Sequence, residues 1–126
     1  AAAGVRAAGL DEVVRAADVV SLHVPLVEST RNLFSAARIA SMKPGAVLVN
    51  TARGGIVDEV ALVRALKDGH LAGAAIDVFA AEPLPASPHF EDCPNLILTP
   101  HVAGVTAEAN ERVSFLIADK VLEALA

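Results

Sequence analysis

Short apolar runs alternate with amphipathic segments along the chain, and this alternation limits the fold more than any other feature. The runs span residues 18–24, 46–50, 72–77 and 96–99, and each is typical of a buried strand. Several of the segments between them carry apolar residues at helical spacing. Because strands and helices alternate without internal repetition, the sequence predicts an α/β fold built on a doubly wound parallel sheet.

Helix boundaries can be predicted as well. The expected helices span 11–17, 35–42, 58–66 and 105–125. Asp58 is placed to cap the third of these helices, and Gly69 is placed to end it. The last helix is amphipathic, and its apolar stripe is a face that needs a partner; the stripe consists of Val113, Leu116, Ile117, Val121 and Leu122.

The composition indicates one packed domain and excludes several classes of protein. The chain has 126 residues, of which 54% are hydrophobic, with no Trp or Tyr, so its core should be built from small and branched side chains. A net charge of -5 without a basic cluster argues against nucleic-acid and anionic-membrane partners. The lone cysteine, Cys93, excludes an internal disulfide and fits a reducing compartment. No apolar run approaches the ~20 residues of a membrane span, and residues 1–9 do not form a signal peptide, so we expect a cytoplasmic protein.

Three polar residues each follow an apolar run of the predicted sheet: Arg53, Glu82 and His101. Because the carboxyl ends of parallel strands share one edge, these side chains should converge on one crevice. An arginine binds a carboxylate through two parallel hydrogen bonds, and a carboxylate beside an imidazole orients it and favours its protonated form. Together they could handle a 2-keto acid. Taken singly, each has a simpler interpretation: a surface arginine in a tight turn, a solvated loop carboxylate and a structural histidine.

Other polar residues are weaker candidates. Asp77 ends an apolar strand and is either the equivalent of a helix cap or a carboxylate facing the same crevice. His23 ends the first strand, where it could line a cofactor pocket, whereas His70 follows a helix cap and His89 lies among prolines. No His and Cys residues have the spacing of a metal site, and no Gly-x-Ser-x-Gly motif indicates a serine nucleophile. The proline-rich stretch 79–95 is expected to be functional or flexible.

Taken together, these stretches resemble the D-2-hydroxyacid dehydrogenase family over essentially the whole chain. The most specific block is MKPGAVLVNTARGGIVDE at residues 42–59, and residues 17–26 and 99–101 also match. The resemblance implies a Rossmann-type NAD-binding domain in which Arg53 binds the substrate carboxylate and keto oxygen, His101 is the acid/base, and Glu82 orients and charges His101. It further implies that NAD is lined by His23, Val24, Pro25, Thr51, Ala52, Arg53, Asp77, His101, Ala103 and Gly104.

The chain departs from the family pattern at its beginning. The family's nucleotide domain opens with a strand, a Gly-x-Gly-x-x-Gly turn and an acidic residue that binds the adenosine ribose, and none of these is present. We therefore expect residues 1–126 to be a partial NAD-binding domain whose last helix, 105–125, leads back to a missing substrate domain. Without the acidic residue, NADP is not excluded.

The resemblance implies a homodimeric oxidoreductase that acts on the CH-OH group of a D-2-hydroxy acid. Formate dehydrogenases of the same superfamily are similar but carry glutamine in place of Glu82, since removing hydride from formate needs no proton acceptor. The glutamate thus indicates proton-coupled hydride transfer. The substrate stays open among 3-phosphoglycerate, hydroxypyruvate, glyoxylate, sulfolactate and lactate. Two alternatives remain: the carboxy-terminal-binding co-repressors, which are similar over the same motifs and act as NAD-sensing partner-binding dimers, and an inactive truncated remnant.

Overall fold

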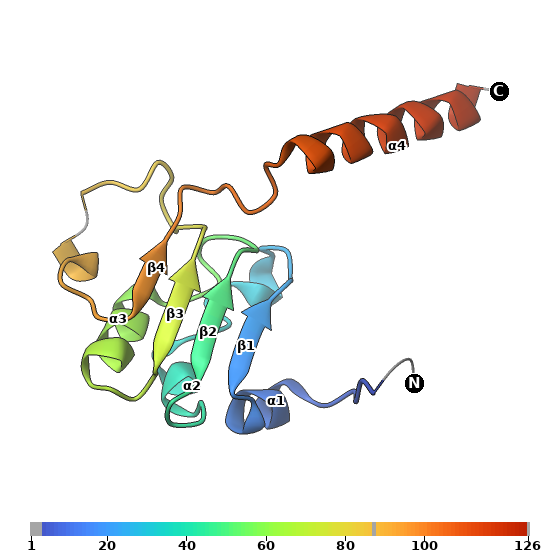
Figure 1. The fold of residues 1–126 in the computed structure, drawn as a ribbon. Coiled ribbons are helices and arrows are strands. Elements are labelled where there is room, and N and C mark those ends of the chain that lie inside the picture. Colours follow the sequence, from blue (N-terminus) through green and yellow to red (C-terminus); the bar gives the residue numbers. More distant parts are fainter. Residues whose placement is uncertain (1–3, 87, 126) are drawn as a thin grey trace.

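The computed structural model describes residues 4–86 and 88–125, which form a single four-stranded sheet with neighbouring helices (Figure 1). The strands lie in the order β1-β2-β3-β4, and every neighbouring pair is parallel. Their bounds are Val19–Leu22 for β1, Val47–Asn50 for β2, Gly73–Ile76 for β3 and Leu96–Leu98 for β4. The predicted α/β fold with a parallel sheet is therefore confirmed, and all four strands end at the same edge.

The register of the sheet places inward-facing residues side by side. Val20 pairs with Leu48, Leu48 with Ala74, and Ala74 with Leu96. Side chains alternate between buried and more exposed along β1, β2 and β3, as expected when one face of a sheet is covered and the other is more open.

The helices lie close to the predicted positions. Their bounds are Leu10–Ala16 for α1, Ala36–Ala40 for α2, Glu59–Lys67 for α3 and Ala107–Leu125 for α4, with short 3-10 helices η1 at Glu28–Thr30 and η2 at Pro88–Phe90. Asp58 caps α3, since its Oδ1 accepts a 3.0 Å hydrogen bond from the amide of Ala61. Gly69 follows the end of α3 at a φ of +71°, a conformation that glycine adopts without steric cost. Helix α2 is shorter than expected, because the chain leaves it before the turn at 43–45.

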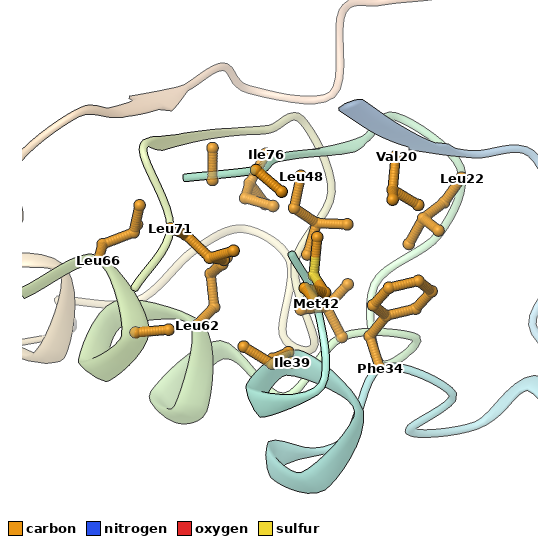
Figure 2. Packing of buried hydrophobic residues seen from close by; sticks show 14 of the residues in the cluster. Val20, Leu22, Phe34, Ile39, Met42, Leu48, Leu62, Leu66, Leu71 and Ile76 are labelled. Carbon is orange, nitrogen blue, oxygen red and sulfur yellow. The ribbon is translucent and has the colours of Figure 1, made fainter. Parts of the chain in front are cut away.

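One hydrophobic core lies between the sheet and the helices. Figure 2 shows Ile39 of α2 and Leu62 of α3 packed below the strand residues Leu48 and Ile76. Leu48 and Leu62 are completely buried, and such burial stabilises the fold by about 1.5–3 kcal/mol for each side chain. The opposite face of the sheet is more open, as the 63% exposure of Ile97 illustrates.

Helix α4 extends away from the sheet (Figure 1). Every residue of its predicted apolar stripe is at least 50% exposed: Val113, Leu116, Ile117, Val121 and Leu122. The amphipathic pattern of the helix is confirmed, and its apolar face has no cover within the described residues. None of the described helices combines the length and the apolar character that a membrane crossing requires.

Candidate active site at the carboxyl edge of the sheet

Two loops that leave neighbouring strands meet at Gly54. This residue follows β2, and its backbone lies so close to the loop after β3 that an added Cβ would be 1.7 Å from the carbonyl oxygen of Phe79. Only glycine allows that approach. The contact fixes the loop that carries Arg53 against the loop that carries Glu82.

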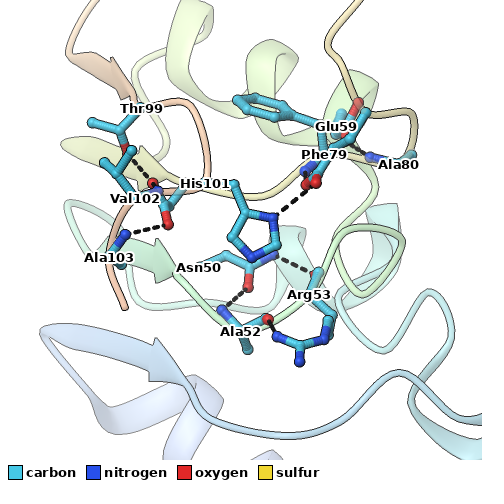
Figure 3. A network of polar contacts seen from close by, with 12 residues as sticks. Asn50, Ala52, Arg53, Glu59, Phe79, Ala80, Thr99, His101, Val102 and Ala103 are labelled. Carbon is cyan, nitrogen blue, oxygen red and sulfur yellow. Dashed lines mark hydrogen bonds and ion pairs between the residues drawn. The ribbon is translucent and has the colours of Figure 1, made fainter. Parts of the chain in front are cut away.

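His101 and Glu82 form the polar pair predicted from the sequence. The Nδ1 of His101 lies 2.8 Å from Oε2 of Glu82, and the two side chains are 48% and 36% exposed. In Figure 3 this contact is the dashed line that starts from the ring of His101. The other carboxylate oxygen of Glu82 accepts a 2.8 Å hydrogen bond from the amide of Phe79. The hydrogen bond with His101, followed by that from Phe79, lowers the pKa of the Glu82 carboxyl below its ordinary value. Glu82 is therefore ionised at neutral pH and can orient the imidazole.

Asp77 organises the turn that presents His101. Its buried carboxylate accepts hydrogen bonds from the hydroxyl of Thr99 and from the amides of Val102 and Ala103, both at 2.9 Å. Burial raises the pKa of Asp77, but these hydrogen bonds outweigh it and the net pKa is lowered. The turn holds His101 at a φ of +56°, which is uncommon for a residue other than glycine. Of the two interpretations of Asp77, the structure shows the equivalent of a cap, with a carboxylate that is occupied by its own turn.

Arg53 is the third residue after β2, and its guanidinium donates a 2.6 Å hydrogen bond to the carbonyl of Ala52. The side chain is exposed, and no hydrogen bond joins it to Glu82 or His101 within the described residues.

Asn50, which the sequence reasoning treated only as a strand residue, shapes this loop. Asn50 is buried; its side-chain amide donates to the carbonyl of Arg53 at 3.1 Å, and its side-chain oxygen accepts from the amide of Ala52 at 3.1 Å (Figure 3). An asparagine that ends an apolar strand directly before a turn is the signal that could have identified it.

Two cavities open along this edge. One, of about 330 Å³, is lined by six of the predicted cofactor residues: His23, Val24, Pro25, Thr51, Ala52 and Arg53. His23 is held there by a 2.8 Å hydrogen bond between its Nε2 and the hydroxyl of Ser21. The other cavity, of about 590 Å³, is mainly apolar and has Glu82 and His101 among its lining residues. Neither cavity is lined by Asp77, Ala103 or Gly104. A hydrogen bond joins the amide of Ala103 to the carboxylate of Asp77 in the turn around His101.

The smaller cavity has the size of a pocket for a small ring system and lies where ligands bind in parallel α/β sheets. No glycine-rich turn for the pyrophosphate occurs in the sequence. Among the residues that the structure describes, no group of three or more His, Cys, Asp or Glu side chains is placed to hold a metal ion.

Comparison with known proteins identifies the family. Residues 1–103 match the model of the D-isomer specific 2-hydroxyacid dehydrogenase, NAD binding domain. The chain belongs to this family. The (S)-sulfolactate dehydrogenase of Chromohalobacter salexigens is 54% identical over 120 residues, which are 95% of this chain and 39% of that protein. The D-3-phosphoglycerate dehydrogenase of Haemophilus influenzae is 52% identical over 118 residues, which are 90% of this chain and 29% of that protein.

A solved structure agrees with this assignment. The NAD-dependent formate dehydrogenase from Staphylococcus aureus, in complex with NAD, matches with a TM-score of 0.80 and 40% identity, over 94% of this chain and 35% of that one. The predicted family, the Rossmann-type fold and the NAD-binding character of the domain are thereby confirmed. This 2-hydroxyacid dehydrogenase domain spans between 29% and 39% of the length of the two curated relatives.

Proposed function

We propose that this domain is part of a longer enzyme that reversibly reduces a small 2-keto acid to the D-2-hydroxy acid with NAD, without excluding NADP. The observation that carries the proposal is the 2.8 Å contact between His101 and Glu82 at the carboxyl edge of the sheet. The names of the two curated relatives, a sulfolactate and a phosphoglycerate dehydrogenase, support a small 2-hydroxy acid as the substrate. Helix α4 would then continue into the substrate domain, which would cover its apolar stripe.

The pair determines which nitrogen of His101 exchanges a proton with the substrate. With Nδ1 of His101 donating to the ionised Glu82, Nε2 is the nitrogen left to face the substrate. In the reducing direction, protonated His101 donates its Nε2 proton to the keto oxygen. In the oxidising direction, the neutral imidazole accepts the hydroxyl proton through the same nitrogen.

Arg53 would bind the substrate carboxylate. Its exposed guanidinium makes one hydrogen bond to a backbone carbonyl, so donors remain for a bidentate contact. This bidentate contact would orient the keto carbon of the substrate relative to His101. When bound, the nicotinamide supplies or accepts the hydride.

The cofactor residues would act in two groups. His23, Val24, Pro25, Thr51, Ala52 and Arg53 would surround the nicotinamide end in the smaller cavity. His101, Ala103 and Gly104 would approach it from the turn that Asp77 holds through its hydrogen bonds to the amides of that turn.

A substrate panel tests the proposal. The full-length protein that contains this chain should oxidise NADH when offered hydroxypyruvate, glyoxylate, the keto acids of 3-phosphoglycerate and sulfolactate, or pyruvate. Binding of NADH without turnover across the whole panel would contradict the proposal and favour the co-repressor class.

We also propose that the enzyme is a homodimer located in the cytoplasm. A lone cysteine suits a reducing compartment, and the exposed apolar residues of the domain would be partly covered by a second subunit. Sedimentation of the full-length protein as a monomer at micromolar concentration would contradict the dimer. A fluorescent fusion outside the cytoplasm would contradict the location.

A further inference from the structure

A second carboxylate lies behind the His101–Glu82 pair. Glu59 is in the first turn of α3, and its side chain is only 15% exposed. Its Oε1 accepts a 2.7 Å hydrogen bond from the backbone amide of Ala80, which lies 21 residues further along the chain (Figure 3). The position at the amino end of a helix favours a negative charge. A largely buried carboxylate thus binds the loop that carries Glu82.

The contact with Ala80 is next to the contact that holds Glu82. The amide of Phe79 donates to Glu82 at 2.8 Å, and the amide of Ala80, the next residue, donates to Glu59 at 2.7 Å. These two amides belong to consecutive planar peptide units that are joined at the Cα of Phe79, so when one amide is fixed only the φ and ψ of Phe79 remain for the other to move. Glu59 therefore acts on the same short segment that directs Glu82 toward His101.

Glu59 also faces the far part of the same loop. Its Oε2 lies 3.7 Å from Nε2 of His89 in η2, and this nitrogen is buried without a hydrogen-bond partner in the part of the chain that the structure describes. Phe90, the neighbour of His89, packs edge-on against Phe79 with ring centroids 5.9 Å apart. The side chain of Glu59 thus lies between η2 and the beginning of the loop that follows β3.

We propose that Glu59 is a positioning residue, which holds the segment 79–80 so that Glu82 meets His101. This inference rests on the proposed function only in treating the pair as the acid/base of the reaction. The positioning itself is a structural property, and it can be measured without turnover.

The test compares three variants of the full-length protein by carboxyl NMR. With glutamate side chains labelled with carbon-13, the titration of Glu82 is followed in wild type and in Glu59→Ala. The hydrogen bonds from His101 and Phe79 lower the pKa of Glu82, so loosening of the segment should raise that pKa toward its ordinary value. Glu59→Gln keeps an oxygen that can accept from Ala80. In this variant, Glu82 should therefore titrate as it does in wild type.

Asp58→Ala is the matched control. It removes the cap at the same end of α3, a 3.0 Å hydrogen bond to Ala61, without touching Ala80. It should lower the melting temperature and leave the titration of Glu82 unchanged. An unchanged titration in Glu59→Ala, or an equal shift in Asp58→Ala, would overturn the proposal.

Two further measurements complete the test. If Glu59→Ala does not fold, amide exchange in the wild-type protein decides: protection of Ala80 supports the proposal, and exchange at the rate of an open loop overturns it. If the enzyme turns over, kcat of Glu59→Ala should fall by about threefold or more with the KM for NADH unchanged. Absence of turnover in wild type would refute the proposed function and leave the titration result intact.

Discussion

Replacing Gly54 by alanine should separate the two loops of the candidate active site. The new Cβ would lie 1.7 Å from the carbonyl oxygen of Phe79, whereas Cβ atoms essentially never approach a heavy atom closer than 3.0 Å. The backbones must therefore move apart by more than an ångström. That movement also strains the hydrogen bonds that the amides of Phe79 and Ala80 make with Glu82 and Glu59.

The cost can be estimated from the size of this clash. Overpacking of a tight interior costs about 1–3 kcal/mol, and a backbone-on-backbone clash belongs at the upper end or beyond, so we expect a loss of about 3 kcal/mol or more. For a domain of this size, the melting temperature should fall by about 10 °C or more. Urea unfolding of Gly54→Ala, followed by circular dichroism, measures the loss.

Gly9→Ala is the matched control for this experiment. A Cβ at Gly9 meets no atom within 4 Å, and the residue has an extended backbone with a φ of -68° and a ψ of 153°, which alanine also adopts. The substitution should therefore change stability by less than about 0.5 kcal/mol. If Gly54→Ala were as stable as Gly9→Ala, the close approach of the two loops would be wrong.

Three other perturbations follow from the site. Asp77→Asn removes a charge and one acceptor from the buried turn and should cost about 1–3 kcal/mol in urea unfolding; an equal loss in the exposed Asp119→Asn would contradict that reasoning. Because the folded-state pKa of Glu82 is lowered, its contribution to stability is present above the ordinary value of 4.5 and is lost as pH falls through the lower folded-state pKa, so Glu82→Gln should show a weaker loss of melting temperature on acidification. Arg53→Lys keeps the charge without the bidentate contact and should lower kcat/KM about tenfold or more; wild-type efficiency would remove Arg53 from the site.

The order of elements could be predicted from local patterns alone. The four apolar runs became β1 to β4, and Asp58 and Gly69 delimit α3 as expected, because strand periodicity and helix capping depend on residues close in the sequence. The pairing of Glu82 with His101 was also predicted, since residues that follow parallel strands must meet at one edge. That prediction needed the family resemblance to become specific, because a single glutamate or histidine in a loop has many possible roles.

Contacts between distant backbone segments were decided by the tertiary structure. In the sequence Gly54 is only one residue of the block at 42–59, and only the fold brings Phe79 against it. The sequence left two interpretations of Asp77 open, and the hydrogen bonds from the turn at 99–103 to its carboxylate are seen only in the structure. The sequence likewise assigned Glu59 no role beyond the first turn of a helix, and its contact with Ala80 depends on where α3 packs. The physical reason is that a backbone amide has no sequence signature: every residue except proline carries one, and which carboxylate it meets depends on how the strands and helices pack.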